Sequence, residues 1–347
     1  MQETINIVVE QETLVRIVLL SFASFFLSML LTPIYTTLAY TYQWWKKPRA
    51  EAVTGEKASV YQALHGAKHR RHIPTMAGVI FVLAIAMITI SGNLSRSETW
   101  LPLAAMVGAG LIGLFDDFLN IGSTGGIAGM RAKIKMFLII MVALIGGWWF
   151  YYKLDVTAIN IPFVDSPLFL GWLIVPLFVL VVVSTANAVN ITDGLDGLAG
   201  GLAAIAFAMY ALIAFLEGRY GIAGFCLTIV GALLSYTWFN IYPARFFMGD
   251  VGSFALGTAL GVVAMLTDTV LILPIIGFIF VVEAGSSLLQ IISKKIRRGR
   301  KIFRIAPIHH HFEAIGWEET KVTMRFWVVG QVMGVIGLIV YILSRPL

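Results

Sequence analysis

The chain has 347 residues, of which 59% are hydrophobic and only 13% are charged, with a formal net charge of +6. A soluble domain carries about a quarter charged residues, so this composition excludes an ordinary water-soluble protein and indicates a surface that mostly faces lipid. The single cysteine, Cys226, excludes an intramolecular disulfide and a cysteine-ligated metal site.

Ten apolar runs along the chain are candidates for membrane-spanning helices, each of which needs about 20 mostly apolar residues. The first begins near Leu14 behind an acidic N-terminus and is too long for a cleaved signal peptide, so we expect a retained span. The runs are 14–40, 75–92, 100–117, 134–152, 167–186, 198–216, 220–239, 253–268, 270–292 and 325–343. They predict an all-α integral membrane protein with a single polytopic domain over residues 1–347.

The basic residues are distributed unevenly between the loops that join these runs. Most of the 25 lysines and arginines lie in four alternate loops, which are 42–72, 116–135, 240–252 and 293–325, while the remaining loop of the same alternation, 187–197, has none. Because basic side chains mark the cytoplasmic side of a membrane, we expect both termini outside and five loops inside. This bias accounts for the positive charge, and we expect no nucleic-acid partner. All six histidines fall on the predicted inner side: His65, His69, His72, His309, His310 and His311.

The third run ends in two adjacent carboxylates, Asp116 and Asp117. Carboxylates at the end of an apolar helix are costly unless they are solvated, paired or bound to a cation, and the partial negative charge of a helix C-terminus adds to the cost. The pair could be an interfacial stop signal. Hard oxygen ligands also suit Mg²⁺, which binds one or two carboxylates and phosphate oxygens. We therefore predict a site that handles a divalent cation or a phosphate.

The fifth run ends in the sequence Asn-Ala-Val-Asn-Ile-Thr-Asp-Gly-Leu-Asp-Gly, which starts at Asn187. Asn187, Asn190 and Asp193 recur every three residues, and Asp196 continues the series, so on a helix they would lie along one side. The glycines allow unusual backbone angles and the close approach of a ligand. A turn would explain one Asp-Gly pair but not the whole run, which we interpret as a ligand-binding edge.

The loop after the seventh run contains Asp250 between two glycines. We expect Ser253 to cap the following helix, whose free N–H groups could receive a phosphate while Asp250 holds a metal ion. Phe246 or Phe247 could stack on a nucleobase, and interfacial anchoring is the alternative for both rings.

The ninth run and the loop behind it carry the last polar groups. Glu283 lies within the run, which indicates either a polar cavity or a packed ion pair. The loop contains His309, His310 and His311. A zinc site is the weaker interpretation, because three adjacent side chains rarely reach one tetrahedral metal. A row of donors for phosphate oxygens is the better one.

Five segments together closely resemble the polyprenyl-phosphate N-acetylhexosamine-1-phosphate transferases. They are 74–76, 115–118, 187–197, 247–253 and 307–313, so the resemblance extends over nearly the whole chain. The run from Asn187 and the triple-histidine run followed by Phe-Glu are highly specific. The histidine pattern favours the branch of the family that uses UDP-N-acetylmuramoyl-pentapeptide.

The resemblance implies a reaction at the bacterial inner (cytoplasmic) membrane. Undecaprenyl phosphate would attack the β-phosphorus of UDP-N-acetylmuramoyl-pentapeptide, releasing UMP and forming lipid I, with Mg²⁺ as cofactor and a homodimer as the assembly. A one-step attack and a covalent aspartyl-phosphate route both remain open.

The resemblance also implies roles for individual residues. Asp250 would bind Mg²⁺, while Asp116 and Asp117 would serve the lipid phosphate as base or electrostatic organiser and are further candidate ligands of the ion. The residues implied in binding the nucleotide donor are Asn187, Asn190, Asp193, Asp196, Asn240, Phe247 and Gly249. Those implied in contacting phosphates or the sugar are Lys68, Thr75, Lys133, His309, His310 and His311.

The chain departs from the family's usual residues at a few places in these segments. Met76-Ala77-Gly78 stands where the family usually has Gly-Gly, and His72 stands where it usually has Gly. Asn120 replaces a common Lys after the aspartate pair, and Phe137 replaces a common Gln.

Two other functions fit parts of the pattern. A sister transferase would use UDP-N-acetylglucosamine instead of the muramoyl-pentapeptide donor. A secondary transporter of an anionic solute would explain charged residues within spans and Gly-broken helices. That alternative predicts polar residues near the middle of the membrane and similar clusters on both faces, and apart from Glu283 the sequence shows neither.

Overall fold

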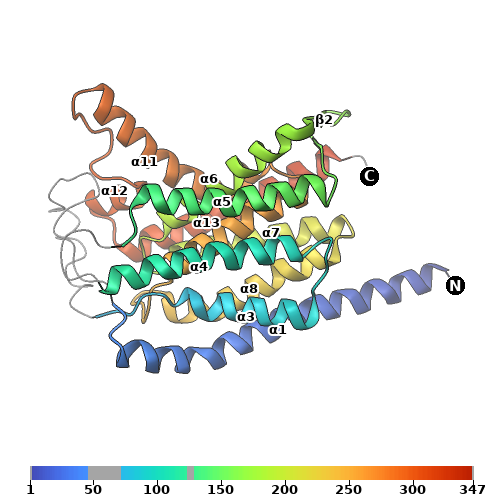
Figure 1. The fold of residues 1–347 in the computed structure, drawn as a ribbon, viewed down its shortest axis with the longest axis horizontal. Helices are drawn as coiled ribbons and strands as arrows, with labels where there is room; N and C mark the ends of the chain where they lie inside the picture. The colour runs from blue at the N-terminus through green and yellow to red at the C-terminus, as the bar shows by residue number, and fades with distance from the viewer. Residues whose placement is uncertain (1, 46–71, 123–128, 346–347) are drawn as a thin grey trace.

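The computed structural model describes residues 2–45, 72–122 and 129–345, with side chains from residue 11 onward. Long helices run side by side in a bundle, and a small β-ribbon lies at one end (Figure 1). The first helices are α1 (Gln2–Thr41), α3 (Gly78–Gly92), α4 (Trp100–Gly122), α5 (Ala132–Tyr152), α6 (Ile174–Thr192), α7 (Leu198–Leu216) and α8 (Tyr220–Asn240). They are followed by α9 (Gly249–Leu266), α10 (Leu273–Ile276), α11 (Phe278–Ile296), α12 (Ile308–Ala314) and α13 (Glu319–Ser344).

The predicted all-α membrane class is confirmed. Within the described residues, 8 helices are long and apolar enough to cross a membrane. Each of the ten predicted runs contains a helix, but two of these helices fall short of a clear span. Helix α3 has only 15 residues. Helix α11 carries Glu283, has two lysines in its last turn and diverges from the bundle (Figure 1). The number of ten spans therefore stays a prediction.

The fifth span begins a few residues later than predicted. Residues 168–169 form β2 (Leu168–Phe169), which pairs antiparallel with β1 (Ala158–Ile159). The apolar helical stretch is Gly171–Thr192, in which a short 3-10 helix, η1 (Gly171–Leu173), leads into α6. Both residues of β2 are exposed, and the ribbon lies at one end of the bundle (Figure 1). The predicted break between the eighth and ninth runs is confirmed, because α9 ends at Leu266 and Asp268 has a φ of +48°.

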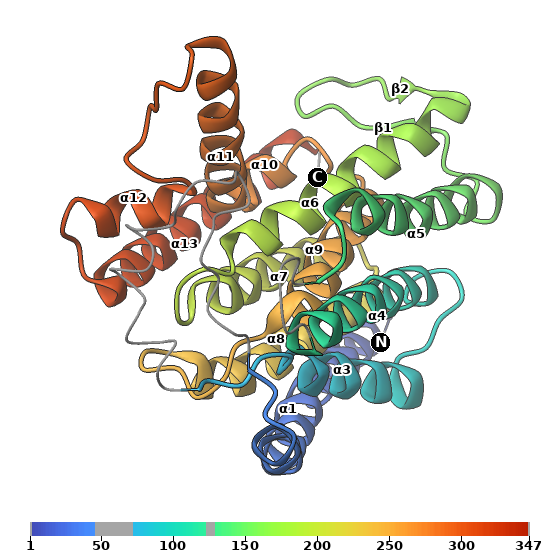
Figure 2. The same ribbon diagram turned by 60° about the vertical axis from the view of Figure 1, so that its left-hand side comes forward.

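Helix α9 lies in the middle of the bundle, between α4 and α6 (Figure 2). In the 18-residue apolar window of α9, 94% of the residues are buried inside the protein, compared with 17% in the corresponding window of α1. Its neighbours approach closely where they carry glycine: a Cβ at Gly113 of α4 would collide with the backbone of Asp250. Apart from Asp250, every residue of α9 is buried. The first turn of α9 is therefore held against the last turns of α4.

Both ends of the described chain lie at one end of the bundle, and α12 lies at the other (Figure 1). The C-terminal end of α4, the N-terminal end of α5 and the segment with the three histidines share the α12 end. The predicted even number of spans requires both termini on one side, and the two described ends do lie at one end of the bundle. Which side of the membrane they face stays a prediction.

Candidate active site

The aspartate pair lies in the last two turns of α4. Asp116 and Asp117 are almost completely buried, whereas Phe115 and Phe118 beside them are exposed. The sequence suggested that the helix ends at this pair, but α4 continues to Gly122. The two carboxylates therefore face the protein interior, and they need partners there.

Asp116 and Asp250 share one cation, the ammonium of Lys135. Its Nζ lies 2.8 Å from Oδ2 of Asp116 and 2.6 Å from Oδ2 of Asp250. Asp116 also accepts from Nδ2 of Asn120 at 2.9 Å and from the N–H of Met130 at 2.6 Å. Side chains from α4, α5 and α9 thus meet at one point, as the predicted gathering of Asp116 and Asp250 requires.

Asp117 faces the first turn of α9. Its Oδ2 accepts from the N–H of Val251 at 3.2 Å, one of the free donors at a helix N-terminus. Gly249 has a φ of +73°, and a Cβ there would meet Oδ2 of Asp117 and Oγ1 of Thr75. Only glycine fits this left-handed position without displacing those oxygens. Thr75, Asp117 and Gly249 are therefore brought together as predicted.

Thr75 is placed by an extended segment that runs along the loop before α9. The N–H of Phe247 donates to the carbonyl of Pro74 at 2.8 Å, and the N–H of Ala77 donates to the carbonyl of Phe247 at 3.0 Å. The N–H of Thr75 donates to Trp44 at 2.7 Å. Segments that are far apart in sequence are thus fixed beside the carboxylates.

The polar residues at the end of α6 and just beyond it divide into two groups. Asn190 donates from Nδ2 to Oγ of Ser253 at 2.8 Å, beside the first turn of α9. The prediction that Ser253 caps α9 is wrong, because its hydroxyl donates to the carbonyl of Gly249 within the helix. Asp193 ends α6 and is only half-buried. Asn190 thus lies beside the turn that carries Asp250, and Asp193 follows one helical turn later in the chain.

Asp196 and Asn240 form the second group, and both contact the backbone of neighbouring segments. Oδ2 of Asp196 accepts from the N–H of Ala244 at 3.0 Å. Asn240 accepts from the N–H of Gly197 at 3.0 Å and donates to the carbonyl of Phe246 at 2.9 Å. These bonds fasten the loop 241–248 to the end of α6, so both side chains fix the position of that loop.

The two phenylalanines of this loop differ in their surroundings. Phe246 is buried among the rings of Tyr35, Tyr236 and Phe239. Phe247 is half-buried beside the glycine that opens α9. Of the two rings that could stack on a base, Phe247 is the accessible one. Asn187, in contrast, donates to the carbonyl of Val183 within its own helix at 2.8 Å.

The three histidines do not form one row. Nδ1 of His309 lies 2.8 Å from Oε2 of the buried Glu283, and its Nε2 faces Gly194. Nδ1 of His310 lies 2.8 Å from Oε2 of Glu313. His311 accepts a bond from the N–H of Arg304 at 3.2 Å. His309 is the ring that approaches the end of α6. Contact of the three rings with a phosphate stays a prediction.

A polar stripe on α11 fastens the histidine segment. Ser286 accepts from the N–H of Ile308 at 3.0 Å, and Ser293 donates to the carbonyl of Arg300 at 2.9 Å. Gln290 accepts from the N–H groups of residues 302 and 303 and donates to the carbonyl of 303. Together with Glu283 these residues lie on one face of the helix and are buried. Glu283 is thus part of a packed pair, the second of its two predicted settings.

Comparison with known proteins gives one family. A family model described as glycosyl transferase family 4 matches residues 99–268, a stretch that includes all three aspartates of the cluster. Three similar curated proteins are named phospho-N-acetylmuramoyl-pentapeptide-transferase. That of Clostridium perfringens (strain SM101 / Type A) is 37% identical over 318 residues, covering 90% of this chain and 93% of the relative. That of Geobacillus sp. (strain WCH70) is 37% identical over 271 residues, covering 76% and 82%. That of Methylacidiphilum infernorum (isolate V4) is 38% identical over 298 residues, covering 80% of each.

The chain belongs to the phospho-N-acetylmuramoyl-pentapeptide transferase family. The resemblance stated from the motifs is thereby confirmed, and the transporter alternative is left without support.

The donor set at the centre of this transferase fits a magnesium ion. Within the described residues, no three His, Cys, Asp or Glu side chains form a ready-made metal cage. Mg²⁺ often binds one or two carboxylates and takes its other ligands from water and substrate phosphates. Asp116 and Asp250 already contact the same cation through Oδ2, so their oxygens lie within reach of one ion.

Of the two predicted lysines, Lys133 is exposed and does not make these contacts, and Lys68 lies outside the described residues. Lys135 and Asn120 are functional neighbours that the sequence analysis missed. Asn120 stands where the family usually has a lysine, which indicates that the aspartate pair takes its cation from elsewhere. Lys133 and Lys135 lie on different sides of α5, and the motif does not show which of the two faces the aspartates.

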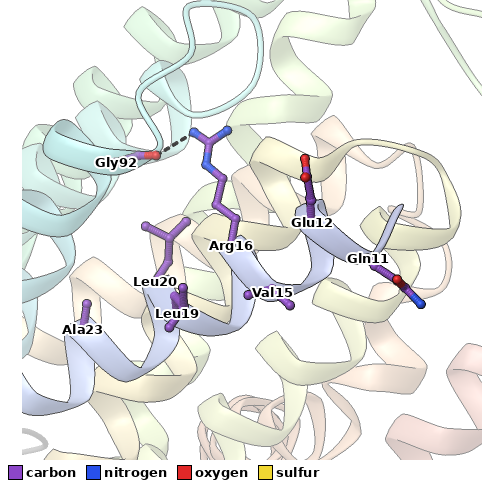
Figure 3. Close-up of a pocket in the computed structure, with 8 residues that line it drawn as sticks. All are labelled: Gln11, Glu12, Val15, Arg16, Leu19, Leu20, Ala23 and Gly92. Atoms are coloured by element: carbon purple, nitrogen blue, oxygen red, sulfur yellow. Dashed lines mark hydrogen bonds between the residues drawn. The ribbon is translucent and has the colours of Figure 1, made fainter. Parts of the chain in front are cut away.

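A pocket of about 630 Å³ lies away from this cluster, beside α1 (Figure 3). Arg16 donates across it to the carbonyl of Gly92 at 2.8 Å. Gly92 ends α3, whose other end begins at Gly78 beside α9, so the pocket is at the far end of the bundle. It is lined by Gln11, Glu12, Val15, Arg16, Leu19, Leu20, Ala23 and Gly92. None of the three aspartates of the candidate active site lines this pocket.

The far end of the bundle also carries charged residues that the sequence had not shown as a cluster. Glu217 pairs with Arg219 at 3.2 Å and with Arg345 at 3.0 Å. Both oxygens of Asp268 accept from Asn160. Burial raises the pKa of Glu217 and of Asp268, although the nearby arginines act in the opposite direction. These contacts join α7, α9, α13 and the ribbon.

Proposed function

We propose that the protein transfers phospho-N-acetylmuramoyl-pentapeptide from its UDP conjugate to undecaprenyl phosphate, giving lipid I and UMP. The observation that carries this proposal is the meeting of Asp116, Asp117 and Asp250 at one end of a bundle of apolar helices. The group that is transferred is inferred from the names of the relatives. The acceptor's head group is tethered to the membrane surface and the donor is soluble, so both can reach a site at the end of the spans.

The reaction joins two phosphates, which repel each other. Mg²⁺ bound at Asp250, with Asp116 and Asp117 close by, would neutralise charge on the pyrophosphate. Asp117 accepts from the first turn of α9 and so orients its carboxylate toward that turn. Thr75 and the N–H groups of the same turn would bind phosphate oxygens. Lys68, Lys133 and the histidines complete the proposed phosphate and sugar contacts.

The nucleoside would bind where α6 meets the loop before α9. Asn190 and Asp193 offer polar groups on this side, and Phe247 offers a ring face. Asn187 belongs to the same proposed surface. Asp196 and Asn240 act on this surface through the backbone of the loop 241–248 that they hold. We further propose a homodimer in the bacterial inner membrane, with this end of the bundle in the cytoplasm.

A donor comparison tests the function. The purified protein is incubated with undecaprenyl phosphate, Mg²⁺ and either UDP-N-acetylmuramoyl-pentapeptide or UDP-N-acetylglucosamine, and UMP and the lipid product are measured. We expect product with the first donor and at most a trace with the second. Product with UDP-N-acetylglucosamine alone would support the sister transferase, and no product with either would contradict both.

A further inference from the structure

Lys135 joins two carboxylates that come from different helices. Its Nζ contacts Oδ2 of Asp116 in α4 and Oδ2 of Asp250 in α9. The ammonium also lies 5.4 Å from the centre of the Phe254 ring, one turn beyond Asp250, which attracts it as a third neighbour. We propose that Lys135 is an internal counter-ion that holds the two carboxylates together before Mg²⁺ binds, and that the ion displaces it. The inference rests on the magnesium dependence of the proposed function.

The charges explain why the metal-free protein needs this lysine. The side chain of Asp116 is 3% exposed and that of Asp250 is 16% exposed, so water screens their mutual repulsion poorly. An ammonium between them offsets that repulsion and keeps α4, α5 and α9 in register. Without it, one carboxylate would have to turn away, because two buried like charges in one site are unfavourable.

The same contacts oppose the metal. A divalent ion that binds Asp250 competes with the ammonium for the carboxylate and is repelled by its charge. Lys135 has a flexible four-carbon stem and a side chain that is 20% exposed, so it has a route out of the cluster. Binding of Mg²⁺ and retention of the Lys135 contacts therefore exclude each other. Lys135 acts as a positioning residue that sets the affinity of the site for its ion.

A metal titration tests this exchange without the reaction. Mn²⁺ is titrated into the purified full-length protein and followed by electron paramagnetic resonance, and Mg²⁺ is then used as competitor. We expect Lys135→Gln to bind the ion about tenfold more tightly than the wild type, within the usual range of coupled binding events. Lys135→Arg, which keeps the charge, should stay near the wild type.

Lys133→Gln is the matched control for metal binding. It removes one positive charge from the same end of α5, but Lys133 is exposed and lies on another side of the helix. We expect its metal affinity to change less than about twofold, because exposed charges are well screened. A similar gain in Lys133→Gln and Lys135→Gln would show a general charge effect and would overturn the displacement.

A measurement on the wild type covers the case in which Lys135→Gln does not fold. Acetylation of lysine side chains is followed by mass spectrometry in EDTA and in Mg²⁺. We expect Lys135 to be modified several-fold faster in Mg²⁺, while Lys133 reacts at the same rate in both. An unchanged or slower rate at Lys135 would overturn the proposal.

The proposed function and this inference fail in different ways. If neither the wild type nor any variant binds Mn²⁺ or Mg²⁺, the magnesium dependence itself is wrong. If all bind with equal affinity, or if Lys135→Gln binds more weakly, the ion is present but Lys135 is not its competitor.

Discussion

Asp250 is the residue whose side chain links the proposed metal site to the central helix. Asp250→Asn keeps the size of the side chain but removes the charge that attracts a cation. We expect UMP release to fall at least about 100-fold, as for the loss of other transition-state contacts, with the melting temperature changed by only a few degrees. Asp165→Asn, at an exposed carboxylate in the ribbon loop, is the control and should keep full activity.

Asp268, at the other end of the molecule, gives a prediction about pH. Burial raises its pKa above the ordinary value of 3.8. The folded state therefore holds the proton more tightly than the unfolded chain, and this stabilisation is present below pH 3.8 and is lost as pH rises through the raised folded pKa. Asp268→Asn does not titrate. Melting temperatures measured from about pH 4 to about pH 7 should show the wild type losing stability relative to the variant; a relative gain would contradict the direction.

For individual residues, the sequence predicted which side chains belong to the site better than it predicted which of them contact each other. Asp116, Asp117, Thr75, Gly249 and Asp250 are brought together as expected. The aspartates could be found because charge in an apolar run is conspicuous. Lys135 could not be told from Lys133 by the motif alone, since which of two neighbouring lysines faces inward depends on how α5 is rotated against α4.

Helix α11 shows how one element positions a distant loop. Gln290→Leu removes one acceptor and one donor, which hold the backbone of residues 302 and 303. Each backbone group left without its partner costs about 1–3 kcal/mol, so we expect a lower melting temperature and faster tryptic cleavage in the basic segment 297–304. Ser287→Ala, off the polar stripe, is the control. Equal cleavage of both variants would contradict this fastening role.

Among the elements, helices were predicted well and their ends less well. Apolar runs of about 20 residues can only be helices in lipid, since a helix satisfies its own backbone hydrogen bonds. The ribbon was missed because Leu168 and Phe169 are apolar and directly precede a true span. The start of α9 four residues before the predicted run also escaped notice, because Gly249 and Asp250 resemble a loop until the close contact with α4 is known.

The whole molecule gives a topology that can be tested from outside the cell. We expect the cluster end to face the cytoplasm and the ribbon to face outward. In a Cys226→Ala background, Asp165→Cys should react with a membrane-impermeant maleimide in intact cells, whereas Lys301→Cys should react only after the membrane is opened. The reverse pattern would place the aspartates outside. Cys226 itself is buried, so the unaltered chain should not react.

The enclosure of α9 also affects how the protein is made. Its apolar window has a mean hydropathy of 1.5, below the 2.3 of the first span, and almost none of its surface is left for lipid. A newly synthesised α9 therefore gains little from entering the bilayer alone and is stabilised by the groove that α4 and α6 have already formed. Ribosome-bound chains that stop shortly after residue 266 should retain this helix only when those two partners are intact, so the order of synthesis itself guides assembly of the catalytic end.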